Sequence, residues 1–333
     1  MKPRHPILAA LAVVLLLVGS SSCRDERSRL SASVGLPSEL LLVVDPQVWG
    51  SDLSDSLTQL LKGEVPGLMQ QEPFFRLTRV LSQHYTRSYS TMHSKLFVRI
   101  DPRLRRPMLG VSRNVVARPQ IEVTLAAPSL DALRAYIYSK GMDARQLLAD
   151  AQIEMRAARL RRHFSPQADA ALREVLGYSI CAPREIQATK KAERFLWAGS
   201  NRNEKDLNLV VYAYPWDGSD ICTPETFVAK RDSVMQQHIP GSTDEQWMQT
   251  TRIDGRPVVF CSQRAIDGRR VQEVRGLWEM RRGALGGPFV SLVTIDTTAA
   301  QVVVAEGFVY SPSTDKRDLL RMVEASLRTL RKC

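Results

Sequence analysis

Cys23 is the residue whose surroundings most clearly indicate chemistry, because its thiol directly follows a patch of small residues at 19–22. Before this patch, Lys2 and Arg4 give a positive start, and residues 7–18 are all apolar. This order is typical of a secretory signal peptide. The apolar run has about a dozen residues, fewer than the roughly twenty that span a bilayer. We therefore expect export and cleavage beside a thiol that can be modified.

The signal resembles that of bacterial lipoproteins, in which the cysteine receives lipid and becomes the first mature residue. It departs from that pattern at Ser20, where leucine is usual, and an ordinary cleaved signal with Cys23 as a plain thiol is the alternative. Arg24, Asp25 and Glu26 resemble the export signal that sends Bacteroidetes lipoproteins to the outer leaflet of the outer membrane, although a solvated tether would look the same. Because two or three acyl chains hold a protein firmly, we expect a palmitate-bearing anchor in the cell envelope, at the outer membrane on an undecided face.

Two further groups could form a site in the second half of the chain. Arg275 and Glu306 lie within apolar strands and could meet across the sheet, and a buried charge must be paired. This favours a structural ion pair over a functional site. Four aromatic residues could line one face of the same sheet: Tyr212, Tyr214, Trp216 and Trp278. Such residues are more often core, and an exposed patch would instead indicate a partner or glycan site.

Sequence motifs for catalysis and metal binding are absent. The sequence contains no HExxH, no GxSxG and no phosphate-binding glycine loop. The cysteines after Cys23 form no CxxC pair: Cys181, Cys222, Cys261 and Cys333. We expect Cys181 and Cys261 to be buried thiols and Cys333 to be exposed. The sequence therefore predicts no catalytic residue, no metal and no cofactor, and leaves enzymatic activity open.

The net charge of +11 is high for a chain of 333 residues, and removal of Lys2 and Arg4 with the signal leaves +9. Export removes nucleic acid from the expected partners. The remaining anions are lipid headgroups, acidic glycans and other envelope proteins. Arginines gather at the end of a helical stretch at 142–164, where they meet the negative end of the helix dipole. We favour that structural role over a dedicated anion site.

Periodicity predicts an α+β chain of two domains with antiparallel sheets and packed helices. The expected parts are a signal at 1–22, a lipidated tether at 23–36, a first domain at 37–164, a bridging helix at 165–177 and a second domain at 178–333. Asp254-Gly255 and Asp267-Gly268 predict hairpins within a five-strand meander of an α/β/α-type sandwich. A closing helix buries leucines and valine and points five cations largely outward: Lys316, Arg317, Arg321, Arg328 and Arg331.

Five stretches carry a resemblance to an uncharacterised Bacteroidetes lipoprotein family, domain-of-unknown-function family 4837. They are ELLLVVDPQVW (39–49), PETFVAKRDSV (224–234), EVRGLWEM (273–280), GGPFVS (286–291) and VVVAEGFVYSP (302–312). The resemblance implies an envelope lipoprotein of unknown role and supplies no catalytic residues. The second half also resembles the Mog1/PsbP-like fold, a common binding module, and a fold alone does not assign function.

We therefore expect an exported, lipid-anchored and non-enzymatic protein that binds an envelope protein or an anionic glycan. The alternative is an enzyme that acts on an envelope glycan or lipid through an unrecognised site. A third possibility is a structural subunit of a larger envelope complex.

Overall fold

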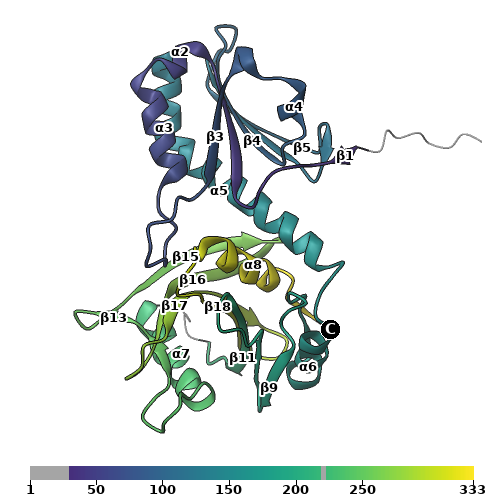
Figure 1. Cartoon of the computed structure of the whole chain (residues 1–333), viewed down its shortest axis with the longest axis vertical. Coiled ribbons are helices and arrows are strands. Elements are labelled where there is room, and N and C mark those ends of the chain that lie inside the picture. The colour runs from purple at the N-terminus through teal and green to yellow at the C-terminus, as the bar shows by residue number, and fades with distance from the viewer. Residues whose placement is uncertain (1–29, 219–222) are drawn as a thin grey trace, which may run out of the picture.

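The computed structural model describes residues 30–218 and 223–333. Each half of the chain contains a β-sheet, and the long helix α5 (Leu130–Leu160) leads from the first half to the second (Figure 1). Helices and antiparallel strands occur in both halves, which confirms the α+β class. The predicted signal peptide and lipid site at Cys23 lie outside the described residues. Within the described part, no helix has the length and apolar character needed to cross a bilayer.

The sheet of the first half has the strand order β3-β2-β4-β7-β5. Its strands are β2 (Glu39–Val44), β3 (Arg76–Leu81), β4 (Ser94–Ile100), β5 (Met108–Arg113) and β7 (Ile121–Ala127). The prediction of an antiparallel sheet is wrong for this half, because β3, β2, β4 and β7 pair in parallel and only β5 is antiparallel. The reason is the connection after β2: helix α3 (Asp52–Lys62) crosses over the sheet, and a crossover returns the chain parallel.

Helices cover this sheet unequally. On one face α3 and α5 pack over a large apolar core that includes Leu42, Leu57 and Leu148. The helical stretch predicted to begin at residue 142 is part of a longer helix, because α5 begins at Leu130 and runs unbroken through Gly141. A Cβ at Gly141 would lie 2.6 Å from a methyl carbon of Leu60 on α3. The short helix α2 (Pro46–Trp49) lies on this same face, since its Val48 belongs to the large core. The other face carries η1 (Ser82–His84) and α4 (Arg87–Ser90), which belong to the segment that covers a smaller apolar cluster.

The second half contains an eight-stranded antiparallel sheet of order β12-β16-β17-β18-β11-β10-β9, with β15 also paired to β16. Its strands are β9 (Ala188–Ala192), β10 (Phe195–Gly199), β11 (Asp206–Pro215), β12 (Met248–Thr250), β15 (Val259–Ile266), β16 (Arg269–Met280), β17 (Gly286–Asp296) and β18 (Gln301–Tyr310). The meander runs from β15 to β18. It has four strands and not the five predicted, because the first predicted strand, β12, instead pairs with the end of β16 that β15 does not reach.

Short strands complete the connections. Asp254 and Asp267 have positive φ at the two expected hairpin turns, the first between β13 (Arg252–Ile253) and β14 (Arg256–Pro257). Strand β8 (Tyr178–Ser179) pairs with β19 (Arg331–Lys332) beside the C-terminus.

Helices lie on both faces of this second sheet, as the sandwich prediction requires. Helix α7 (Pro224–His238) covers one face, and α6 (Pro166–Leu176) and α8 (Arg317–Leu327) cover the other. Helix α6 begins at the Ser165 cap and ends at Gly177, whose φ of 70° is left-handed. It was expected to bridge the halves, but Ala168 and Leu172 bury it in the core of the second half.

Helix α8 lies between the two halves (Figure 1). Its apolar side, including Leu320 and Val323, packs on the second sheet. The prediction that its cations face outward is wrong for four of the five, because the first half covers that side: Lys316, Arg317, Arg321 and Arg328 are buried, and Arg331 is exposed.

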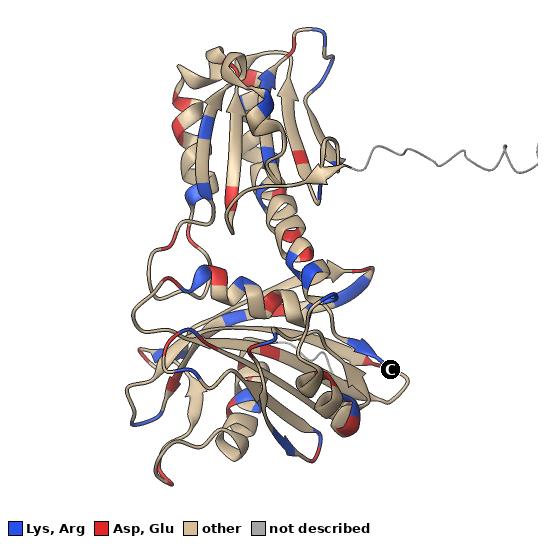
Figure 2. Cartoon of the chain, turned by 45° about the vertical axis from the view of Figure 1, so that its right-hand side comes forward, with Lys and Arg blue, Asp and Glu red and all other residues tan. Residues whose placement is uncertain are grey.

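Polar contacts from the first half satisfy this face of α8. The Glu72 carboxylate accepts the backbone N–H groups of Lys316 and Arg317 at 2.7 and 2.9 Å, at the start of the helix. Arg321 donates to Ser38 Oγ at 2.7 Å and to the Phe74 carbonyl at 2.9 Å. Charged residues of both signs gather along α8 in Figure 2. The two halves are therefore joined by a buried polar layer, together with a small apolar cluster in which Ile153 and Ala157 of α5 meet Ala325 of α8.

Candidate anion-binding cleft

The four aromatic candidates do not form an exposed patch. Tyr212 and Trp278 are almost completely buried in the core beneath α7. Tyr214 and Trp216 are partly buried and pack against the same core. Their position agrees with the core interpretation, since alternate residues of β11 point toward α7.

Glu306 is buried and Arg275 is partly buried, and both form ion pairs, but not with each other. On β17, Val290 is the neighbour of Arg275 and Ser291 is the neighbour of Glu306. Because successive residues of a strand point to opposite faces, the two charges lie on opposite sides of the sheet. The predicted ion pair between Arg275 and Glu306 is therefore wrong, because the two side chains emerge on different faces of the sheet.

Glu306 pairs instead with Arg231 of α7, and both side chains have no exposed surface. The guanidinium donates to the two carboxylate oxygens at 2.9 and 2.7 Å, and its carbon lies 4.0 Å from the centre of the Phe289 ring. Ser291 Oγ also donates to Glu306, at 2.8 Å. Burial, with the nearby Glu306 charge, raises the pKa of Tyr212 well above its ordinary value. Closed on every side, this network is part of the core.

Arg275 belongs to a second network on the α8 side of the sheet. It donates to Glu273 at 2.8 Å and to Glu324 of α8 at 2.6 Å. Arg328 links Glu324, at 3.0 Å, to Asp150 of α5, at 2.6 Å. Burial alone would raise the pKa of Glu324, but Arg275 and Arg328 lower it to about 2. This chain of charges connects the second sheet to the first half.

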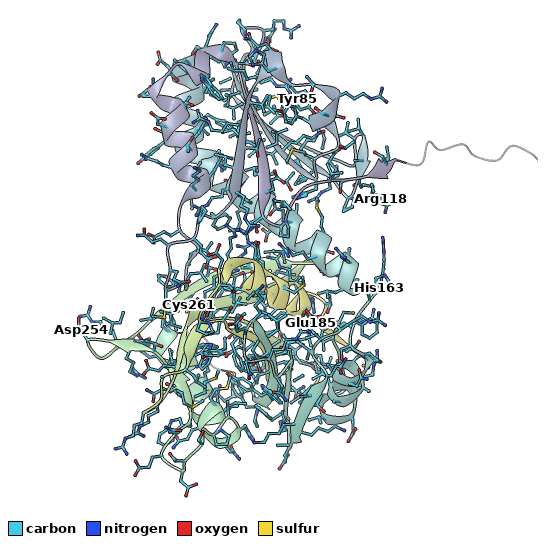
Figure 3. The ribbon with its side chains drawn as sticks, viewed as in Figure 1. Tyr85, Arg118, His163, Glu185, Asp254 and Cys261 are labelled. Carbon is cyan, nitrogen blue, oxygen red and sulfur yellow. The ribbon has the colours of Figure 1, made fainter. Side chains whose placement is uncertain are left out.

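The predicted burial is right for two of the three described cysteines and wrong for the third. Cys181 is buried as expected and Cys333 is exposed, but Cys261 is exposed on the edge strand β15, where Figure 3 labels it. These three described cysteines form no disulfide.

An arginine-rich cleft of about 320 Å³ lies where the end of α5 meets α6, the β8–β19 pair, the β15–β16 turn and the end of α8. Its charged lining consists of five arginines and one aspartate: Arg161, Arg173, Arg269, Arg328, Arg331 and Asp267. The rest is apolar or small: Phe164, Ser179, Cys181, Thr329 and Leu330. Figure 3 labels His163 beside this region, at the end of α5.

Three of these arginines are neutralised by carboxylates. Arg161 pairs with Glu154 at 2.6 Å, Arg173 with Asp169 at 2.7 Å, and Arg328 with Asp150 and Glu324. For Asp169, burial alone would raise the pKa, but hydrogen bonds from Ser179 and Arg173 lower it below its ordinary value. These pairs hold the guanidinium groups in place within the cleft walls.

The other two arginines have no salt bridge among the residues that the structure describes, and Asp267 is the one carboxylate among the lining residues of the cleft. Arg269 donates only to the Leu330 carbonyl, at 3.3 Å, and neither Arg269 nor Arg331 has a salt bridge within the described residues. Arg328 is 6% exposed, and its Nε is buried without a hydrogen-bond partner in the described part of the chain. Guanidinium groups bind carboxylate and phosphate through paired N–H donors. The cleft can therefore bind an anion of either kind.

The sequence predicted arginines at the end of α5, but it did not predict the cleft. Arg161 is the member that this pattern marked, whereas Arg269 and Arg331 come from a hairpin and the last strand. The preferred explanation was a dipole contact at the helix end. Only the tertiary structure brings arginines from five elements together.

Family comparisons divide the chain in the same place as the two sheets. Residues 165–329 match the domain of unknown function DUF4837, and residues 33–161 match another, DUF8532. Four of the five resembling stretches lie in the first match, and the stretch at 39–49 lies in the second. No curated protein matches the chain. A solution structure of cyanobacterial PsbP (CyanoP) from Synechocystis sp. PCC 6803 is similar over 47% of this chain and 87% of that one, with 10% identity and a TM-score of 0.32.

Proposed function

We propose that this chain is a lipid-anchored envelope protein that binds an anionic polymer without modifying it. Its first half matches DUF8532 and its second half matches DUF4837. The observation that carries the proposal is the cleft, where guanidinium groups from five elements converge and two lack a carboxylate partner. Cys23 supplies the anchor. The protein would act as a binding or accessory component at the outer membrane.

Charge and shape favour an acidic glycan as the ligand. Neutralised arginines in the walls keep the cleft rigid, and the charges of Arg269 and Arg331 attract an approaching anion. The apolar surfaces of Phe164 and Leu330 offer contact for sugar rings between the charges. A uronic-acid polymer presents carboxylates at regular spacing and so fits several guanidinium groups at once.

Binding can be tested by calorimetry with polygalacturonate, and with inorganic phosphate as a second probe. The variant Arg269→Gln/Arg331→Gln should lose roughly tenfold in affinity, because it removes two positive charges from the cleft. The matched control is Arg202→Gln/Arg256→Gln, which removes two exposed arginines that do not line the cleft. Equal loss in both variants would mean that net charge alone binds the polymer and would refute the cleft.

The same experiment separates the alternatives from the proposal. Shortening of the polymer by the purified wild-type protein would replace the binding role with an enzymatic one. Lipidation is tested independently by radiolabelled palmitate, which should enter the wild-type chain and not Cys23→Ser.

A further inference from the structure

One edge of the first half exposes apolar side chains beside the point where the described chain begins. Strand β1 (Ser31–Ala32) pairs in parallel with β6 (Ala117–Arg118), and Ser31 Oγ donates to the Val116 carbonyl at 3.3 Å. Figure 1 shows β1 at the side of the molecule, and Figure 3 labels Arg118 next to it. Leu30, which precedes β1, therefore lies against the turn that leads into β6.

Several apolar side chains at this edge are exposed to solvent. Val111, Val115 and Val116 are 43%, 49% and 41% exposed, and Leu30 is 38% exposed. We call these four residues, with Arg113 and Arg118, the tether-proximal strip. Residues 108–118 and 30–36 contain these two arginines and no acidic residue. Neither arginine has a salt bridge within the described residues.

The covalent chain places this strip close to any lipid on Cys23. Leu30 is seven positions after Cys23, and a fully extended chain spans at most about 3.6 Å per residue. The Cα of Leu30, at the near end of the strip, therefore stays within about 25 Å of the Cα of Cys23. Apolar side chains at the level of the headgroups, flanked by arginines and free of carboxylates, are suited to an anionic bilayer surface.

We propose that the tether-proximal strip rests on the bilayer, with its valines among the headgroups and Arg113 and Arg118 on lipid phosphates. This contact orients the protein on the membrane instead of leaving it to swing on its tether. The inference rests on the proposed lipid anchor for its location, but the strip's own affinity for lipid does not depend on the anchor.

The test uses the mature chain carrying Cys23→Ser, which has no lipid, and flotation with phosphatidylethanolamine–phosphatidylglycerol vesicles. The unlipidated protein should float with the vesicles, and Val115→Asp/Val116→Asp should lower the binding constant roughly tenfold or more. Arg113→Gln/Arg118→Gln should weaken binding by a similar factor, and only on vesicles that contain phosphatidylglycerol. The matched control is Ile253→Asp/Leu285→Asp, which changes two exposed apolar residues of the second half.

Several results would overturn the inference. They are no flotation of the unlipidated chain, equal losses in the strip and control variants, or a dimer in sedimentation that the valine variant disrupts without any vesicle binding. Circular dichroism checks that each variant is folded. Palmitate labelling and polymer binding are measured separately, so failure of the strip and failure of the proposed function are distinguishable.

Discussion

Removal of the Glu306 carboxylate should destabilise the protein strongly. In Glu306→Gln the Arg231 guanidinium keeps its charge and has no exposed surface, so water cannot replace the lost partner. Its remaining neighbours are Thr250 Oγ1 at 3.1 Å, the Met248 sulfur at 3.7 Å, the Phe289 ring and the Asp232 carboxylate, which lies 3.6 Å from the guanidinium. Only Asp232 carries a negative charge, and it compensates weakly because it is 22% exposed and its Oδ1 accepts hydrogen bonds from Thr250 instead. A buried ion that loses its partner costs about 3–5 kcal/mol, and we expect a loss in that range.

Urea unfolding followed by circular dichroism measures this loss. Arg231→Met/Glu306→Leu removes both charges and should be clearly more stable than Glu306→Gln, because no buried ion is left. The control Asp143→Asn breaks the exposed pair with Lys140 and should change the free energy of unfolding by less than about 1 kcal/mol. A loss below about 1 kcal/mol in Glu306→Gln, or a double variant no better than it, would refute the reasoning.

Three further predictions concern α8. Glu324 has a pKa of about 2 in the fold against 4.5 ordinarily, so it stabilises the fold above pH 4.5. That contribution should disappear as the pH falls from 4.5 toward 2, and acid unfolding of Glu324→Gln should lack this component. Glu72→Ala removes the hydrogen-bond acceptor at the start of α8 and should lower the free energy of unfolding in urea by roughly 1–2 kcal/mol. An unchanged free energy of unfolding would contradict this prediction. Gly307→Ala places a Cβ 2.6 Å from Val323 and should lower the thermal midpoint by several degrees, and an unchanged midpoint would show that α8 can shift.

Local signals predicted many elements correctly. Ser165 and Gly177 mark both ends of α6, and the two Asp-Gly pairs give the hairpins, because capping and turn preferences depend only on neighbouring residues. The parallel order of the first sheet was missed. Alternation along β7 shows that its residues face two environments, but it carries no information on the direction of the neighbouring strand.

The amino-acid sequence by itself predicted an export signal, and it determined the α+β class, the two halves of apolar periodicity and the excess of arginine. Only the tertiary structure decided the partners of those arginines. Arg275 and Glu306 were separated by the face on which each side chain emerges, and the polar side of α8 was buried because the first half packs over it. The cleft arose from residues more than a hundred positions apart, Arg161 and Arg331 among them. The partner of a charged residue depends on strand register and on how whole helices and sheets pack together. Neither can be read from a local sequence pattern.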